Sequence, residues 1–227
     1  MIVLRNLNSF DITKQLVYKK EAKVSNISST SISTFNIPIK FRIPEDDDVQ
    51  YLYLQTPRLK YSKIYYGNGF IDFEIETIEK NEDFISSLMS IDNENINYLS
   101  KLLNTDIENS NAYRMSLKLN GKRKKPKLQT IILRGRLSDK VLVYDKNGNE
   151  VDKSCVKEEV DCVSILKLDG IYYQKSDNED DKYMSAYCIW EIVQIKIYEP
   201  KRKVEKVELE KYSIVDDDID ENDVKIE

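Results

Sequence analysis

The segment RLKYSKIYYGNGFIDFEIE (residues 58–76) decides the fold class that this sequence predicts. After the glycines, apolar side chains take every second position and acidic side chains take the positions between them, which is the period of a half-buried strand. The two predicted faces carry Ile71, Phe73 and Ile75 toward a core and Asp72, Glu74 and Glu76 toward solvent. The Gly-Asn-Gly sequence before them is typical of a hairpin turn. We therefore expect a β-hairpin with one buried face.

Strand patterns continue on both sides of this hairpin. Segments rich in β-branched and aromatic residues alternate with loop chemistry along most of the chain. The further predicted strands are FNIPIKFRI (35–43), VQYLYLQ (49–55), AYRMSLKL (112–119), LQTIILR (128–134), KVLVY (140–144), DCVSILKLDGIYYQ (161–174) and KYMSAYCIWEIVQIKIYEP (182–200). The last segment is long and largely apolar on both sides, so we expect a strand that is central or bent around a barrel.

One segment of the chain, residues 81–106, changes from the strand period to the helical period. Its apolar residues recur at helical spacing in two sets, Phe84, Leu88 and Ile91, then Ile96, Leu99 and Leu103. The sequence DNEN (92–95) separates the sets and has the composition of a helix cap. We expect one broken helix or two short helices, inserted near residues 82–104.

The composition indicates a folded protein with a heavily solvated surface. The chain has 227 residues, 33% of them charged and 41% hydrophobic, which is enough to bury a core without disulfides. No apolar run approaches the roughly 20 residues of a membrane span, and the N-terminus lacks the order of a signal peptide. We expect an intracellular protein with no membrane contact. Residues 1–200 form one β-rich domain in this interpretation, and residues 201–227 form a charged linker and a disordered acidic tail.

The residue types argue against an enzyme. The three cysteines have no CxxC spacing and the chain has no histidine, so neither a zinc site nor histidine-dependent nucleophilic catalysis is expected. The carboxylates at 46–48, or Asp92 with Glu94, leave open a metal-dependent nuclease, which would need added Mg²⁺ or Mn²⁺. Consecutive aspartates point to different sides of the chain and are common in exposed loops, so we expect no catalytic residue, metal or cofactor.

Charge is distributed unevenly along the chain. The net charge is -5, yet the last stretch, DDDIDENDVKIE (216–227), carries seven acids and one base, so the rest of the chain is close to neutral. Within that rest, residues 114–140 carry ten bases and one acid. A basic face and an acidic tail therefore coexist in one chain, and the basic part has the charge of a surface that binds phosphates.

The densest basic run is GKRKKPK (121–127), with Lys122, Arg123, Lys124, Lys125 and Lys127. Each lysine or arginine that neutralises a phosphate releases condensed counterions, so this run predicts contact with nucleic acid. The same run also fits a nuclear localisation signal or a solvated hairpin loop.

Tyrosines and cations interleave in the first hairpin. Tyr61, Tyr65 and Tyr66 lie beside Arg58, Lys60 and Lys63, and this strand could present rings to bases and cations to the backbone. The alternative is that the rings fill the core while the cations face water. We interpret residues 55–67 as one wall of a nucleic-acid groove, with Pro57 where strand pairing stops.

A resemblance supports the same interpretation. The motifs that carry it are Gln55-Thr56-Pro57 before a short strand and Gly67, an acidic-aromatic strand, a helical middle, and a late hairpin with Gly170, Ile171, Tyr172, Trp190 and Gln194. Their order, across roughly residues 35–198, resembles the single-stranded DNA-binding proteins of nucleocytoplasmic large DNA viruses. The resemblance implies an OB-fold core with inserted elements and sequence-independent binding of single strands in viral DNA replication, recombination or repair.

The sequence thus predicts a mainly β (α+β) fold: an OB-fold-like barrel with inserted strands and one or two short helices. The residues predicted to bind DNA are Arg58, Lys60, Tyr61, Lys63, Tyr65, Tyr66, Arg114, Lys118, Lys122, Arg123, Lys124, Lys125, Lys127, Arg134, Arg136, Tyr172, Tyr173 and Trp190.

The expected partners follow from the two charged regions. Single-stranded DNA is the expected ligand of the basic face, with RNA and a homo-oligomer left open. The acidic tail would compete for the groove, contact replication proteins, or simply keep the chain soluble. For a viral protein we expect the host cytoplasm, in viral factories, or the nucleus. The alternative function is a virion or assembly scaffold that uses the β surface and the acidic tail for protein contacts.

Overall fold

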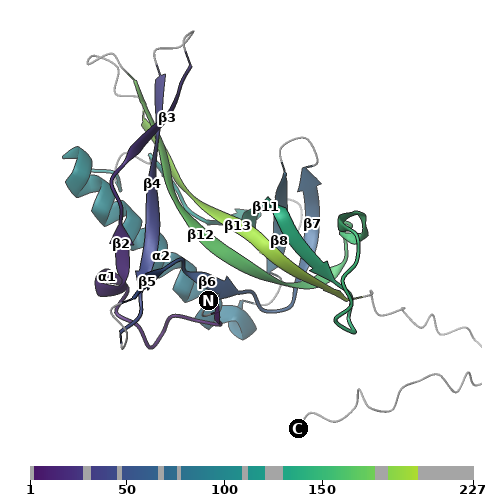
Figure 1. Ribbon diagram of the computed structural model, residues 1–227. Coiled ribbons are helices and arrows are strands. Elements are labelled where there is room, and N and C mark those ends of the chain that lie inside the picture. The colour runs from purple at the N-terminus through teal and green to yellow at the C-terminus, as the bar shows by residue number, and fades with distance from the viewer. Residues whose placement is uncertain are drawn as a thin grey trace, which may run out of the picture.

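The computed structural model describes residues 3–27, 32–44, 48–65, 69–75, 78–108, 112–120, 130–176 and 184–198 (Figure 1). Its elements in chain order are β1 (Val3–Leu4), α1 (Ile12–Gln15), β2 (Leu16–Tyr18), β3 (Ala22–Ile27), β4 (Ile32–Arg42), β5 (Val49–Gln50), β6 (Tyr53–Gln55), β7 (Leu59–Tyr65), β8 (Phe70–Ile75), η1 (Glu79–Asn81), α2 (Glu82–Leu103), β9 (Tyr113–Arg114), β10 (Leu117–Asn120), β11 (Thr130–Tyr144), η2 (Lys153–Cys155), β12 (Asp161–Ser176) and β13 (Met184–Tyr198).

Five of these strands close into a barrel. β7 pairs with β8, and β8 with β11, in antiparallel fashion; β11 then pairs in parallel with β13. The ring closes because β13 pairs with β12 and β12 pairs with β7, both antiparallel. Counted along the chain, the ring order is first, second, third, fifth, fourth, with the third and fifth strands parallel. This is the Greek-key order of an OB-fold, so the predicted fold class is confirmed.

The barrel interior is filled by alternate side chains of these strands. Phe73, Leu133 and Ile192 are 0% exposed. Gly135 on β11 faces the same space, and a Cβ there would lie 2.8 Å from Cγ1 of Ile192. Carbon atoms do not approach that closely, so any larger residue would force the buried Ile192 side chain to shift.

A sheet extends from the barrel as an arm (Figure 1). β12 and β13 are long enough to run beyond the barrel, and β4 pairs with the far part of β12. β3, β2 and β5 in turn pair with β4. β4 approaches β12 closely at Gly170, where a Cβ would lie 2.5 Å from the carbonyl oxygen of Ile37, so glycine is required there.

The helix α2 lies against this sheet and corrects the helical prediction. It is one continuous helix of 22 residues, and it does not break at residues 92–95. Asp92 and Asn95 are 0% exposed, because both point into the protein and not toward a helix end. The helix ends at Asn104, whose φ of 49° is left-handed, an ordinary way for a helix to stop. None of the described helices has the length and apolar character that a membrane crossing needs.

Strand boundaries also differ from the predicted ones. The segment 49–55 forms two short strands, β5 and β6, since it leaves β4 and then joins β12. Residues 130–134 and 140–144, predicted as parts of two strands, belong to one strand, β11, with an irregularity between Leu137 and Leu142. β13 pairs with β12, β11 and β9, which confirms the expectation of a central strand.

Candidate nucleic-acid interface

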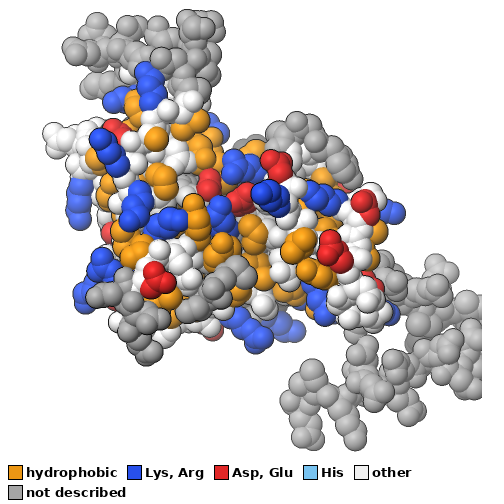
Figure 2. Space-filling model, viewed as in Figure 1, with side chains coloured by type: hydrophobic (Ala, Val, Ile, Leu, Met, Phe, Trp, Pro, Cys, Tyr) orange, Lys and Arg blue, Asp and Glu red, His pale blue; other side chains and the backbone are white. Residues whose placement is uncertain are grey.

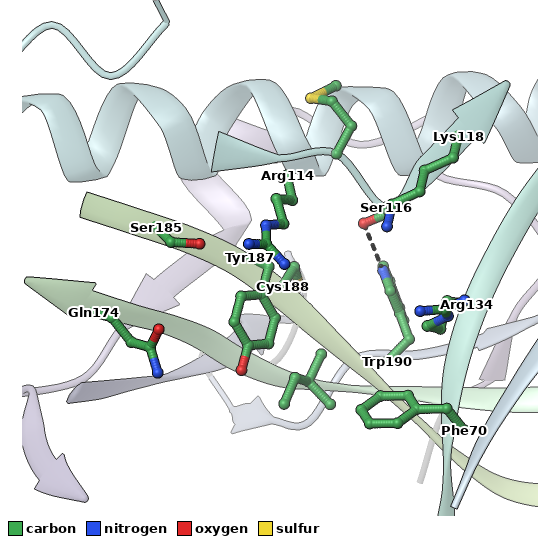
Figure 3. Close-up of a pocket in the computed structure, with 12 residues that line it drawn as sticks. Phe70, Arg114, Ser116, Lys118, Arg134, Gln174, Ser185, Tyr187, Cys188 and Trp190 are labelled. Atoms are coloured by element: carbon green, nitrogen blue, oxygen red, sulfur yellow. Dashed lines mark hydrogen bonds between the residues drawn. The ribbon is translucent and has the colours of Figure 1, made fainter. Parts of the chain in front are cut away.

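A hollow of about 300 Å³ lies where β13 passes from its pairing with β9 to its pairing with β11 (Figure 3). The short segment that carries β9 and β10 bridges these strands, because β9 pairs with β13 and β10 pairs with β11. The hollow is lined by Phe70, Arg114, Met115, Ser116, Lys118, Arg134, Gln174, Ser185, Tyr187, Cys188, Ile189 and Trp190.

The charge of the hollow is positive. Arg114, Lys118 and Arg134 line it, and none of its described lining residues is acidic. Arg114 and Lys118 are exposed, and within the described ranges neither pairs with a carboxylate. An unpaired cation at a concave surface attracts anions, so the rim formed by Arg114 and Lys118 is suited to phosphate groups.

Aromatic side chains form part of the wall. Tyr187 is the cross-strand partner of Arg114, so the two side chains share one face of the sheet, as Figure 3 shows. The Tyr187 ring lies nearly parallel to that of Tyr172, with the centroids 6.2 Å apart. Trp190 is only 1% exposed, and its Nε1 donates to Oγ of Ser116 at 3.1 Å. Its indole is therefore fixed in the wall.

A buried carboxylate under the hollow holds the bridging segment in place. Oδ1 of Asp92 accepts hydrogen bonds from the Tyr113 hydroxyl at 2.8 Å and the Ser116 hydroxyl at 2.9 Å. Its Oδ2 accepts from the backbone N–H of Ser116 at 2.7 Å. Burial raises the pKa of Asp92 to about 6, although these donors oppose that rise. Both oxygens serve protein donors, so Asp92 is a structural acceptor and not a metal ligand in this arrangement.

Asn95, one helical turn further along α2, extends this network to β2. Its Nδ2 donates to the Tyr113 hydroxyl at 3.1 Å, and its Oδ1 accepts from the Tyr18 hydroxyl at 2.9 Å. Polar groups thus connect β2, α2 and the β9–β10 segment. A fully satisfied buried network of this kind fixes geometry, and here it fixes the segment that carries Arg114 and Lys118.

Beside the hollow, the outer face of the barrel carries Arg134. Its Nε and Nη2 donate to the two carboxylate oxygens of Asp72, at 2.6 and 2.9 Å. The Tyr65 hydroxyl donates to the same carboxylate at 3.1 Å. The hydrogen bond to Asp72 raises the pKa of Arg134 further above its ordinary value. Asp72 is therefore not on a solvated face as predicted; it is buried beneath the guanidinium, with its side chain 10% exposed.

Arg136 lies two residues further along β11 and has a similar partner. Its Nη2 lies 3.5 Å from Oδ2 of Asp169. The Tyr172 hydroxyl donates to that same oxygen at 3.1 Å. Lys167 lies 3.6 Å from Asp169 and 2.8 Å from Glu191. The positive charge of this part of the face is balanced by acids within a few ångströms.

The structure brings part of the predicted set together. Those that line the hollow are Arg114, Lys118, Arg134 and Trp190. Those joined to it by the contacts above or by ring contacts are Lys63, Tyr65, Arg136 and Tyr172. Their roles in binding stay predictions, and Trp190 is too buried to offer a ring face to a base.

Arg58 and Lys60 lie elsewhere, at the seam where β7 pairs with β12. Arg58 is 3.0 Å from Asp161, and its guanidinium lies 4.3 Å from the centre of the Tyr198 ring. Lys60 is 2.5 Å from Glu159. Neither lines the hollow.

Two predicted stacking residues belong to the core. Tyr61 and Tyr173 are 0% exposed. Tyr61 packs against Phe73 inside the barrel, and Tyr173 stacks on Phe35 while its hydroxyl donates to Glu21. A ring without an exposed face cannot stack on a base, so the prediction was wrong for both.

Several predicted residues lie outside the described residues, namely Tyr66, Lys122, Arg123, Lys124, Lys125 and Lys127. The ends that flank the basic run do lie within the described part of the chain. Asn120 and Thr130 are cross-strand partners in the β10–β11 pairing, and Lys118 lies two residues before Asn120. The two described residues that flank the run therefore lie opposite each other at the end of the β10–β11 pairing.

Sequence reasoning missed Phe70, Gln174 and Tyr187, which also line the hollow. Phe70 has the same strand parity as Asp72, which was available from the alternation in the first hairpin. The alternation of its strand assigned Tyr187 to one of two faces. Both faces are largely apolar, so the sequence did not show whether the ring lies at the hollow or in the core.

Comparisons with known proteins add structural likenesses only. No family model and no curated protein matches the chain. The single-stranded DNA-binding protein gp2.5 encoded by bacteriophage T7 matches with a TM-score of 0.45 and 12% identity, over 73% of this chain and 100% of that chain. The single-stranded DNA-binding protein from bacteriophage Enc34, in complex with single-stranded DNA, matches with a TM-score of 0.38 and 10% identity, over 81% and 97%. At these scores the likenesses do not decide the fold, which the strand pairing of this chain establishes by itself.

Proposed function

We propose that this protein binds single-stranded DNA without sequence preference, in the hollow between β9, β11 and β13. The observation that carries the proposal is one concave site that combines the exposed cations Arg114 and Lys118 with the half-buried rings of Phe70 and Tyr187. Phe70 lies on the second strand of the barrel and Arg134 on the third. The face of those two strands is where OB-folds take oligonucleotides.

In this proposal the cations contact the phosphates of the strand and the aromatic rings contact its bases. Arg114 and Lys118 attract phosphates, and each phosphate neutralised releases counterions, so affinity falls as salt rises. The Tyr187 ring offers a face to a base, and every base has a face that can stack, so sequence matters little. In a duplex the bases are already paired and stacked on one another. The site therefore favours single strands over duplex.

Fluorescence-anisotropy titration tests this proposal. The ligands are labelled oligo-dT, a mixed-sequence single strand and a duplex, each at several salt concentrations. We expect both single strands to bind more tightly than the duplex. The double variant Arg114→Gln with Lys118→Gln should reduce the slope of log K against log salt by about 1.4, because two phosphate contacts are lost at about 0.7 each.

The matched control is Lys101→Gln, which removes one exposed cation from the last turn of α2. It should leave the slope unchanged. Equal affinity for duplex and single strand would contradict the proposal, and so would an unchanged slope in the double variant. No binding to any strand at low salt would instead favour a scaffold function.

We extend the proposal to a role in DNA replication, recombination or repair, with the acidic residues 216–227 contacting replication proteins. The charge of that segment supports the extension. Truncation after Ser213 tests it: the truncated chain should keep or increase its affinity for oligo-dT and lose such protein contacts. A truncated chain that no longer binds oligo-dT would place the acidic segment in the binding site and contradict the extension.

A further inference from the structure

Two arginines on the outer face of the barrel each contact an aspartate: Arg134 through two short hydrogen bonds and Arg136 through one contact of 3.5 Å. Arg134 and Arg136 are two residues apart on β11, so both side chains leave the same face, about 6.6 Å apart along the strand. Each reaches an aspartate on a different strand, Asp72 on β8 and Asp169 on β12. Each aspartate also accepts a tyrosine hydroxyl. The face thus carries two Arg–Asp–Tyr units.

The first unit consists of Arg134, Asp72 and Tyr65. The guanidinium donates to both oxygens of Asp72, a forked contact that fixes its plane. Its central carbon lies 4.7 Å from the centre of the Tyr65 ring, and its Nη2 also donates to the Tyr65 hydroxyl at 3.0 Å. Arg134 keeps 41% of its side chain exposed, so the fixed guanidinium still presents a surface.

The second unit consists of Arg136, Asp169 and Tyr172. Arg136 keeps 34% of its side chain exposed and Asp169 keeps 20%. The half-buried Tyr172 ring continues toward Tyr187 in the wall of the hollow. The two units therefore flank the site that is proposed to take the strand.

These arginines differ from the cations at the rim of the hollow because their positive charge is neutralised by a neighbouring acid. In each unit the aspartate lies within hydrogen-bond distance of the arginine and neutralises its charge. Lys167 and Glu191 neutralise each other in the same way. On the face drawn in Figure 2, acidic side chains lie beside several of the Lys and Arg side chains that cross the middle. A neutralised arginine attracts few counterions, but its plane can still stack on a base.

We propose that the two Arg–Asp–Tyr units are stacking subsites for nucleobases, while the phosphates of the same strand lie on Arg114 and Lys118. This inference rests on the proposed single-strand function. It assigns bases and backbone to different sides of one site. Asp72 and Asp169 act in it as positioning residues: Asp72 fixes the guanidinium plane of Arg134 through its forked contact, and both aspartates keep phosphates away from the arginines.

The test compares oligo-dT with an abasic oligonucleotide of the same length, which keeps the phosphates and lacks the bases. Each is titrated by anisotropy at several salt concentrations against the wild type, Arg134→Gln, Arg136→Gln and Lys118→Gln. Arg134→Gln should weaken oligo-dT binding by about 5- to 150-fold, the range expected for one stacked base, with an unchanged salt slope. Its affinity for the abasic strand should equal that of the wild type.

Lys118→Gln should behave differently, weakening both ligands and lowering the salt slope by about 0.7. Asp72→Asn, which keeps the shape of the side chain, should make the slope steeper because it frees the charge of Arg134. The inference is overturned if Arg134→Gln and Arg136→Gln lower the slope as Lys118→Gln does, or if they weaken the abasic strand equally. A wild type that binds neither strand would instead overturn the proposed function itself.

Discussion

Two groups of cations lie at or beside the hollow, and they differ in whether an acidic side chain pairs with them. Arg114 and Lys118 at the rim of the hollow are exposed and, in the part of the chain that the structure describes, have no acidic partner. Arg134 and Arg136 on the barrel face each lie on an aspartate. The same residue type therefore offers net charge in one region and an oriented plane in the other. A count of basic residues does not distinguish the two.

The rim also depends on a support that the barrel face lacks, and removing that support should give the largest effect. Asp92→Ala removes the acceptor of the buried Tyr113 hydroxyl and of both donors of the half-buried Ser116. We expect a loss of about 3 kcal/mol in the free energy of unfolding, measured by urea denaturation. Binding of oligo-dT should weaken as well, because the segment that carries the rim loses its anchor.

Asn93→Ala is the matched control, since Asn93 is exposed on the same helix. It should change the stability by less than about 0.5 kcal/mol. Equal stability of Asp92→Ala and Asn93→Ala would show that the buried network does not hold the rim.

The aromatic wall gives the next effect. Tyr187→Ala should weaken oligo-dT binding by about 1–3 kcal/mol, the range for one stacked base, and leave the salt slope unchanged. Tyr144→Ala, which removes a half-buried ring at the far end of β11, is the control in the same titration. If both variants bind like the wild type, the wall of the hollow does not contact bases.

The titration of Asp92 gives a smaller effect of known sign. Its pKa in the folded state is about 6, above the ordinary value of 3.8, because burial disfavours the charged form. A folded state that binds the proton more tightly gains stability as the pH falls, so lowering the pH from 7 to 5 should add about 1 kcal/mol from this group. Urea denaturation of the wild type and Asp92→Asn at both pH values measures the difference, which should be absent in the variant. If the wild type instead lost about 1 kcal/mol of stability relative to Asp92→Asn on going from pH 7 to 5, the pKa of Asp92 would be lowered and not raised by folding.

The smallest effect is expected at the seam of β7 and β12. Arg58→Gln removes a cation that is paired with Asp161 and does not line the hollow. We expect a change in oligo-dT affinity of less than about 0.5 kcal/mol, in the range of exposed ion pairs. A loss as large as that of Lys118→Gln would extend the interface to the seam and remove the contrast between the two regions.

The sequence was sufficient for the parts of the fold that depend on period. The alternation around Ile71 and Phe73 predicted the second barrel strand, and the length and two-sided apolar character of residues 182–200 predicted a central strand. The helix break at residues 92–95 was wrong for a physical reason: Asp and Asn are typical of helix caps, but here they accept and donate hydrogen bonds in the interior. Only tertiary partners reveal that use.

The sequence predicted some of the residues that line the candidate site and missed others. Interleaved tyrosines and cations indicated a binding surface, yet Tyr61 faces the core and Tyr65 faces out, because an irregularity between Tyr61 and Lys63 shifts the register of β7. Which arginines are paired also depends on contacts between distant strands, as for Arg136 and Asp169. Phe70 was missed as well, although the alternation of its strand would have placed it on the same face as Asp72.

The most direct test of the central claim uses Trp190, the only tryptophan in the chain and part of the wall of the hollow. Unlabelled oligo-dT is titrated into the protein while the tryptophan emission is recorded, and labelled oligo-dT is followed by anisotropy under the same conditions. If the strand occupies the hollow, the emission changes and both curves give the same Kd. Binding seen by anisotropy with unchanged Trp190 emission would place the strand elsewhere and contradict the account.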